Sequence, residues 1–262
     1  MKPGLFILIL FLAVSALLLA VIRINNISIS PSVNISLSPT PTPKQNIFGN
    51  EITYITKDKS VISATVYSPV NTIPPYKSLI LVHQSDSDRS DWSILVPTLL
   101  DNSYRVLVFD LKGMGKSKSS IEQEPAGVYL DSLVGDLEAS VEYIRNLPDT
   151  DKEHIGVIGA SLGANVAYVY SGSDQNTVSA TVTISASKTN GPLQGKNINN
   201  FRPSNIFFLT DQKDLASSQE FFGKSSNPKS IKIYPDSTAH GVELLKNPQT
   251  VTDILTWLKT SL

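Results

Sequence analysis

Three residues in the second half of the chain have side chains that together can perform nucleophilic catalysis. Ser161 lies in a Gly-x-Ser-x-Gly pattern that runs from Gly159 to Gly163, and an aspartate, Asp211 or Asp214, and then His240 follow it in that order. A serine hydroxyl attacks a carbonyl only when a base removes its proton, and a carboxylate can orient a histidine for that task. The order Ser, Asp, His therefore predicts acyl transfer through a covalent acyl-serine.

The segments around Ser161 would have to present its hydroxyl. The apolar run at residues 155–159 predicts a buried strand, and the run after Ser161 predicts a helix. A nucleophile at such a junction has a strained backbone, beside which bulky neighbours would clash. The helix N-terminus also offers free N–H groups to a developing negative charge. The motif alone is weak, because a plain small-residue turn between a strand and a helix has the same pattern.

Predicted strands and helices alternate through the rest of the domain. The strands are expected at 51–56, 61–67, 78–83, 105–109, 155–159, 180–184, 206–209 and 230–234. The four-residue polar join between the first two predicts an antiparallel hairpin. The other helices are expected at 92–100, with Ser90 or Asp91 as N-cap, at 133–144, and from Pro248 onward, with Asn247 as N-cap. This alternation predicts an α/β fold with a mostly parallel sheet of about eight strands flanked by helices.

Loops at the carboxyl ends of such strands form the ligand site. Reactive residues follow several predicted strand ends, namely His83, Asp110, Ser161, Asp211, Asp214 and His240. We expect these residues to gather at one edge of the sheet. His154 lies instead at a strand start and is expected at the surface.

The amino-acid composition excludes several classes of function. The chain has 262 residues, a formal net charge of −1 and no cysteine. There is no basic field for a nucleic acid partner, and disulfides, thiolate metal sites and a cysteine nucleophile are excluded. The predicted serine chemistry needs no cofactor and no metal.

The N-terminal segment is predicted to be separate from the fold. Residues 3–22 carry no charge and are nearly all apolar, and as a helix they would span about 30 Å, the thickness of a bilayer core. We expect residues 1–23 to be a single-pass membrane anchor; a cleaved signal peptide, which would make the protein secreted, is the alternative. The charges of Lys2 and Arg23 favour an extracytoplasmic domain. Residues 24–47 form a Ser/Thr/Pro-rich linker, and residues 48–262 form the domain.

Five short stretches in this order resemble the α/β-hydrolase superfamily, in particular its dienelactone-hydrolase-like and acyl-esterase-like members. The stretches are Leu-Val-His-Gln at 81–84, Phe-Asp-Leu-Lys-Gly-Met-Gly-Lys-Ser at 109–117, Ile-Gly-Val-Ile-Gly-Ala-Ser-Leu-Gly-Ala-Asn at 155–165, Leu-Thr-Asp-Gln-Lys-Asp at 209–214 and Ala-His-Gly at 239–241. The resemblance covers roughly residue 52 to the C-terminus. It implies the α/β-hydrolase fold and a serine hydrolase.

The resemblance also implies roles for particular residues. Ser161 would be the nucleophile and His240 the base, with Asp214 as the acid. Asp211 stands where many members have glycine and remains an alternative acid, with Asp236 as a third option. The backbone N–H groups of Leu162 and Gln84 would form the oxyanion hole, although many members have glycine at the position of Gln84. His83 would brace the loop after its strand.

Two further motifs resemble ligand-binding sites, but a structural interpretation explains each of them better. The stretch from Asp110 to Ser117 lacks the ending of a phosphate-binding loop and is expected to be structural. Asp86, Asp88 and Asp91 could suggest calcium, but a solvated loop explains them better.

The sequence thus predicts a membrane-tethered serine hydrolase of carboxylic esters. Residues 184–206 are short and polar, without the apolar lid of many lipases, which favours a small-molecule or polymer-borne ester. A serine peptidase or an acyltransferase on the same fold, or an inactive surface binding domain, are the alternatives.

Overall fold

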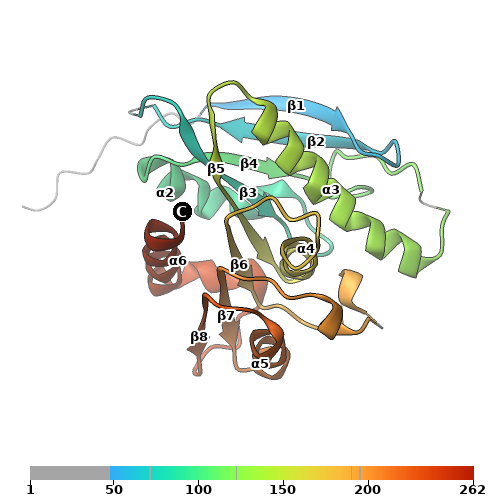
Figure 1. Ribbon diagram of the computed structural model, residues 1–262, viewed down its shortest axis with the longest axis vertical. Helices are drawn as coiled ribbons and strands as arrows, with labels where there is room; N and C mark the ends of the chain where they lie inside the picture. The colour runs from blue at the N-terminus through green and yellow to red at the C-terminus, as the bar shows by residue number, and fades with distance from the viewer. Residues whose placement is uncertain (1–47, 71, 122, 190, 195) are drawn as a thin grey trace, which may run out of the picture. The chain divides into compact units, whose positions relative to one another are not determined.

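A single mixed sheet organises the chain in the computed structural model, which describes residues 48–262 apart from residues 71, 122, 190 and 195 (Figure 1). Its eight strands lie in the order β1-β2-β4-β3-β5-β6-β7-β8. The strands are β1 (Gly49–Ile55), β2 (Val61–Tyr67), β3 (Tyr76–Val82), β4 (Arg105–Phe109), β5 (Thr150–Ala160), β6 (Ala180–Ile184), β7 (Ile206–Asp211) and β8 (Lys229–Tyr234). The pairs β1–β2 and β2–β4 are antiparallel and the other neighbouring pairs are parallel, which confirms the predicted hairpin and mostly parallel sheet.

Both faces of the central strands are buried. In β3, Leu79 and Leu81 face one layer of the core, while Ile80 and Val82 face the other. All five residues of β4 are buried as well. Successive side chains of a strand point to opposite faces, so a strand covered on both sides must be apolar throughout. This is why the sequence shows short continuous apolar runs here.

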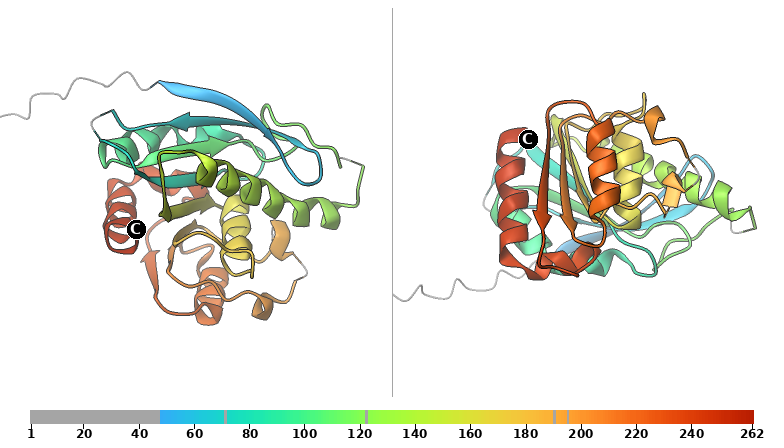
Figure 2. Two further views of the ribbon diagram at one scale, coloured as in Figure 1. Left: turned by 45° about the horizontal axis from the view of Figure 1, so that its top comes forward. Right: turned by 90° about the horizontal axis from the view of Figure 1, so that it is seen from below.

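Helices cover both faces of the sheet (Figure 2). The α-helices are α2 (Val96–Asp101), α3 (Ala126–Asn146), α4 (Leu162–Ser171), α5 (Leu215–Lys224) and α6 (Pro248–Ser261). Short 3₁₀ helices are η1 (Arg89–Ile94), η2 (Gly191–Leu193), η3 (Ile198–Asn200) and η4 (Gly241–Lys246). Helices α2 and α6 pack on one face of the sheet, and α3, α4 and α5 pack on the other.

Several predicted boundaries differ from the structure. The first helix begins as the 3₁₀ turn η1, and Asp88 rather than Ser90 or Asp91 caps it by accepting the Ser90 N–H at 2.7 Å. Strand β5 begins five residues earlier than predicted and α3 begins seven residues earlier. The cap of α6 is confirmed, because the Asn247 side chain accepts the N–H of Gln249 at 3.0 Å.

Helix α5 was not predicted at all. Its sequence has only four apolar residues, Leu215, Ala216, Phe221 and Phe222, and only Ser218 and Phe221 of its ten residues are buried. This short pattern was not recognised in the sequence, and Phe221 holds the helix on the sheet by packing in the core.

The predicted anchor at 1–23 and linker at 24–47 lie outside the described residues. Within the described part of the chain, none of the helices is both long and apolar enough to cross a membrane.

The strand order reverses next to β3. The chain passes from β3 to β4 on one side of it and then crosses to β5 on the other. At such a reversal the loops that follow the strands diverge and leave a crevice at the carboxyl edge. The loops after β3 and β5 contain His83, Gln84 and Ser161, so the fold brings the predicted site residues to this edge.

Candidate active site

Ser161 occupies the sharp junction between β5 and α4. Its backbone has φ 51° and ψ −111°, in the positive-φ region that residues other than glycine rarely adopt. Its N–H donates to the Ile184 carbonyl at 2.8 Å, and its carbonyl accepts the Asn165 N–H at 3.2 Å. Hydrogen bonds on both sides therefore hold the strained conformation, as the sequence pattern predicts.

The two glycines of the motif allow backbones to approach closely around Ser161. A Cβ on Gly159 would lie 2.1 Å from the carbonyl oxygen of Gly163, and one on Gly163 would lie 2.1 Å from that of Val82. Both contacts are with backbone atoms, which cannot move aside without displacing β3 or α4. The expectation that bulky neighbours would clash is confirmed.

His240 lies between Ser161 and Asp214. Its Nε2 is 2.7 Å from the Ser161 Oγ, and its Nδ1 is 2.5 Å from the Asp214 Oδ2. A carboxylate accepts hydrogen bonds, so the imidazole proton belongs on Nδ1 and the Nε2 lone pair faces the serine hydroxyl. The Asp214 side chain is 8% exposed and the His240 side chain is 33% exposed, so the imidazole can be reached from solvent.

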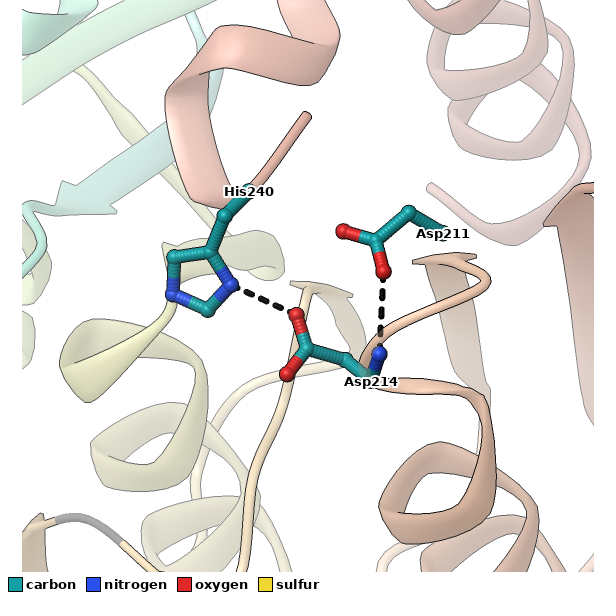
Figure 3. A group of neighbouring side chains, drawn as sticks. All are labelled: Asp211, Asp214 and His240. Carbon is teal, nitrogen blue, oxygen red and sulfur yellow. Dashed lines mark hydrogen bonds and ion pairs between the residues drawn. The ribbon is translucent and has the colours of Figure 1, made fainter. Parts of the chain in front are cut away.

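The structure separates the three acidic candidates, of which Figure 3 shows Asp211 and Asp214. Asp214 hydrogen-bonds to His240, although it stands at the N-cap position of α5 and could have capped that helix. Asp211 is fully buried at the end of β7, where its Oδ1 accepts the Asp214 N–H at 2.9 Å and so fixes the loop. Asp236 is exposed.

Two side chains that the sequence analysis did not assign hold the histidine loop. The N–H of Gly241 donates to the Ser185 Oγ at 3.0 Å, and the N–H of Val242 donates to the Gln84 Oε1 at 3.2 Å. Gly241 has φ +58°, and a Cβ there would lie 2.2 Å from that Gln84 oxygen. Ser185 directly follows β6, and that position at the carboxyl edge was the only available signal.

His83 braces the loop after β3. Its Nε2 accepts the Leu111 N–H at 2.9 Å, so its Nδ1 carries the proton and donates to the Gln84 carbonyl at 2.7 Å. Burial lowers the pKa of His83, which favours the neutral ring that this arrangement requires. The contacts agree with the bracing role expected from the sequence.

The N–H groups expected to bind an oxyanion lie on the elements that flank Ser161. Leu162 is the first residue of α4, where the N–H has no acceptor within the helix. Gln84 lies on the loop that His83 fixes. A serine beside a helix N-terminus and a braced loop can add to a carbonyl and have its negative charge stabilised.

The stretch that begins at Asp110 has a structural role. The Asp110 Oδ1 accepts the Arg89 N–H at 2.8 Å, its Oδ2 accepts the Lys116 N–H at 2.8 Å, and the Arg89 guanidinium lies 3.1 Å away. A Cβ on Gly115, which has φ +52°, would lie 2.5 Å from the carboxylate. These contacts tie two loops together.

A second polar group, which we call the ion cluster, consists of Lys112, Asp58 and Asp136. Lys112 and Asp136 are fully buried, and the Lys112 Nζ contacts Asp58 and lies 3.1 Å from the Asp136 Oδ1. Burial raises the pKa of Asp136 to about 7, although Lys112 opposes the shift. Burial also opposes ionisation of Asp58, but hydrogen bonds from Lys112, Thr56 and Ser60 hold its pKa well below the usual range. One buried cation is thus paired with one ionised carboxylate.

The other residues singled out in the sequence have local partners. His154 lies within β5 and pairs with Asp151 at 2.8 Å, with 42% of its side chain exposed. Asp88 and Asp91 accept hydrogen bonds from groups of their own loop.

Comparison with known proteins places this site in a familiar scaffold. Residues 77–231 match the family described as alpha/beta hydrolase fold. The uncharacterized protein YfhR of Salmonella typhi is 27% identical over 119 residues, which are 44% of this chain and 37% of that protein. The chain therefore matches less than half the length of this curated relative.

Solved structures resemble the whole domain. The Pyrococcus furiosus esterase Pf2001 has a TM-score of 0.65 and 21% identity, covering 85% of this chain and 96% of its own. The dienelactone hydrolase from Anabaena variabilis has a TM-score of 0.62 and 16% identity, covering 82% and 99%. At these identities the likeness shows the shared fold.

Proposed function

Because the chain belongs to the α/β-hydrolase fold family, we propose that it hydrolyses carboxylic esters with Ser161 as the nucleophile. The observation that carries the proposal is the row of short contacts Ser161–His240–Asp214, at 2.7 and 2.5 Å. We call these three residues the reactive row. The geometry supports these roles, because His240 can accept the hydroxyl proton and Asp214 can hold the imidazole in the tautomer that does so.

The first half-reaction forms an acyl-enzyme. The Ser161 Oγ attacks the ester carbonyl while its proton moves to the His240 Nε2, and the carbonyl oxygen becomes an oxyanion facing the N–H groups of Leu162 and Gln84. Collapse of this intermediate breaks the ester C–O bond. The leaving alkoxide takes the proton from Nε2 and departs as the alcohol, leaving the acyl group on Ser161.

The second half-reaction returns the enzyme to its starting state. Water enters through the exposed side of His240, loses a proton to Nε2 and attacks the acyl-serine carbonyl. The Ser161 oxygen leaves with the proton from Nε2, and the carboxylic acid is released. Throughout, Asp214 keeps its hydrogen bond to Nδ1 and stabilises the imidazolium that forms in each half.

The surroundings of the row favour a small or polymer-borne ester. Between β6 and β7 the described residues form only the short turns η2 and η3, without an apolar lid helix. A cleft of about 450 Å³ lies between the start of α3 and η2, and Leu130, Gln194 and Gly191 are among its lining residues. A Cβ on Gly191 would lie 2.4 Å from the side chain of Leu162, so one lining residue of the cleft packs against the residue that follows Ser161. Its mixed polarity suits a short or polar group better than a long acyl chain.

Hydrolysis of p-nitrophenyl acetate by the full-length protein in mild detergent tests the proposal. We expect turnover in the wild type, a decline as the acyl chain is lengthened, and a loss of about 10⁴-fold or more in Ser161→Ala. The exposed histidine variant His154→Gln serves as the control and should keep wild-type rates. Equal turnover in Ser161→Ala and wild type, or none in the folded wild type, would refute the proposal.

We further propose, from the sequence, that residues 1–23 attach the protein to a membrane with the domain outside. Membrane fractionation of cells, followed by protease treatment of intact cells, tests this. A protein found only in the soluble cytoplasmic fraction would contradict it.

A further inference from the structure

Asp211 has a carboxylate oxygen that the proposed mechanism does not use. The side chain is fully buried, and its Oδ1 accepts the N–H of Asp214 at 2.9 Å. Its Oδ2 is also buried and has no hydrogen-bond partner within the described part of the chain. Burying a carboxylate oxygen without a partner is unfavourable, so such a group calls for an explanation. Figure 3 shows this oxygen on the side of Asp211 that faces His240 and Asp214.

The three side chains make a compact set of metal ligands. One ligand atom from each of Asp211, Asp214 and His240 lies within 4.8 Å of the other two. The His240 Nε2 faces Ser161, so Nδ1 is the nitrogen on the carboxylate side. Imidazole nitrogen and carboxylate oxygen are ligands that Zn²⁺ binds in a tetrahedron, with neighbouring donors roughly 3.4 Å apart. His240 lies on a loop, and a small shift of that loop would widen the 2.5 Å contact between its Nδ1 and the Asp214 Oδ2 to that spacing.

We propose that Asp211, Asp214 and His240 form a binding site for a divalent transition metal, with Zn²⁺ as the first candidate, and that the bound metal inhibits the enzyme. The metal-binding half stands on the ligand geometry and on the unpartnered Asp211 oxygen. The inhibitory half rests on the proposed function.

Inhibition follows from the single proton of the neutral imidazole. In the reactive row this proton is on Nδ1, and the Nε2 lone pair accepts the proton of Ser161. A metal ion on Nδ1 needs the lone pair of that nitrogen, so the imidazole proton moves to Nε2. No lone pair then faces the hydroxyl, and the serine stays protonated. A carboxylate of Asp214 that binds the metal also no longer accepts the hydrogen bond from Nδ1 that orients the histidine.

Substitution of Asp211 tests the proposed metal site. In Asp211→Asn the amide oxygen can still accept the Asp214 N–H, while the anionic ligand is lost. Ser161→Ala keeps all three ligands and removes the nucleophile, so binding in this variant does not depend on hydrolysis. His154→Gln removes the exposed histidine that pairs with Asp151 and controls for metal binding at the surface.

The experiment is calorimetric titration of the metal-free, full-length protein with ZnCl₂. We expect one Zn²⁺ per chain in Ser161→Ala and in His154→Gln, and affinity at least tenfold weaker in Ser161→Ala/Asp211→Asn. Equal affinity with and without Asp211, or loss of binding in His154→Gln, would overturn the proposed site.

Ester hydrolysis with increasing Zn²⁺ then tests the inhibitory half. We expect saturable inhibition of the wild type that EDTA reverses, and a tenfold higher inhibitory concentration in Asp211→Asn, each rate being taken relative to that variant without metal. Zinc binding that depends on Asp211 but leaves the hydrolysis rate unchanged would overturn the inhibitory half. The same binding in a chain that does not hydrolyse esters would support the metal site and refute the proposed function.

Discussion

The reactive row and the ion cluster are both short-contact groups of ionisable side chains, yet their settings differ. The row lies on loops at the carboxyl edge of the sheet, with a strained serine at one end and a histidine that is one-third exposed. The ion cluster joins the turn after β1, the loop after β4 and helix α3, and two of its three members are fully buried.

The exposure of the reactive row suits it to catalysis, whereas the burial of the ion cluster suits it to stabilising the fold. A base must meet its substrate, exchange protons with water and return to its starting state, so it needs access. A buried cation needs compensation instead: Lys112 is paired with ionised Asp58, while the raised pKa of Asp136 keeps that acid partly protonated near neutral pH. Substitutions in the two groups should therefore affect different quantities, catalysis in one and stability in the other.

The largest expected effect is on catalysis. In Asp214→Asn an amide replaces the carboxylate and can donate to Nδ1, which stabilises the wrong imidazole tautomer. We expect kcat to fall by about 10⁴-fold with little change in stability. The assay is p-nitrophenyl acetate hydrolysis, with Asp236→Asn as the control, since Asp236 is exposed and should tolerate the change. A greater loss in Asp236→Asn than in Asp214→Asn would show that the acid has been misassigned.

The next effect is on stability. Lys112→Met leaves buried Asp136 and its neighbour Asp58 without their cation, and we expect the free energy of unfolding to fall by about 3–5 kcal/mol. Lys116→Met in the same loop is the matched control, because Lys116 is 71% exposed and its pair with Glu51, at 3.5 Å, should contribute less than about 1 kcal/mol. Urea denaturation measures both. Equal destabilisation by the two variants would contradict the role of the ion cluster.

A smaller effect concerns pH. The pKa of Asp136 is about 7 in the folded chain and about 4 when unfolded, so between these values the folded state binds the extra proton. The wild type should therefore lose stability relative to Asp136→Asn as pH rises from 4 to 7. Urea midpoints measured across this range test the sign, and parallel curves would refute it. Asp58→Asn should differ from the wild type with the opposite sign and at lower pH: the lowered pKa of Asp58 stabilises the wild type above about pH 4, and urea midpoints measured below pH 4 should show this gain being lost.

The smallest effect concerns the histidine loop. Gln84→Met removes the oxygen that accepts the Val242 N–H, and the loss of about 1 kcal/mol corresponds to a roughly fivefold lower kcat. Gln84→Glu retains an acceptor oxygen and should keep more of the rate in the same assay. If both variants lost activity equally, the hydrogen bond would not be the cause.

Local patterns were enough to predict much of the fold and the central site residues. Short apolar runs marked the strands that are buried on both faces, such as β3 and β4, whereas the outer strands β1 and β8 are partly exposed and carry polar residues. The Ser–Asp–His order on the strand ends pointed to the residues of the reactive row, and the structure brings these three together. Their catalytic roles, and the predicted anchor, stay predictions.

The features that the sequence did not reveal depend on contacts between distant segments. Helix α5 has only four apolar residues among its ten, too few for its amphipathic pattern to be recognised in the sequence. The hydrogen bonds that Ser185 and Gln84 accept from the histidine loop join residues 56 and 158 positions apart, so no local sequence pattern could predict them. Lys112 is fully buried. This could not be predicted from the sequence, because lysine side chains are almost always exposed.

Labelling of the full-length protein with a fluorophosphonate tests whether Ser161 is activated, because this reagent reacts readily with a serine that a base deprotonates. We expect one adduct per chain, located on Ser161 by peptide mass spectrometry, and labelling that disappears in both Ser161→Ala and His240→Gln. A folded wild type that takes up no label, or an adduct that persists when His240 is replaced, would contradict this expectation.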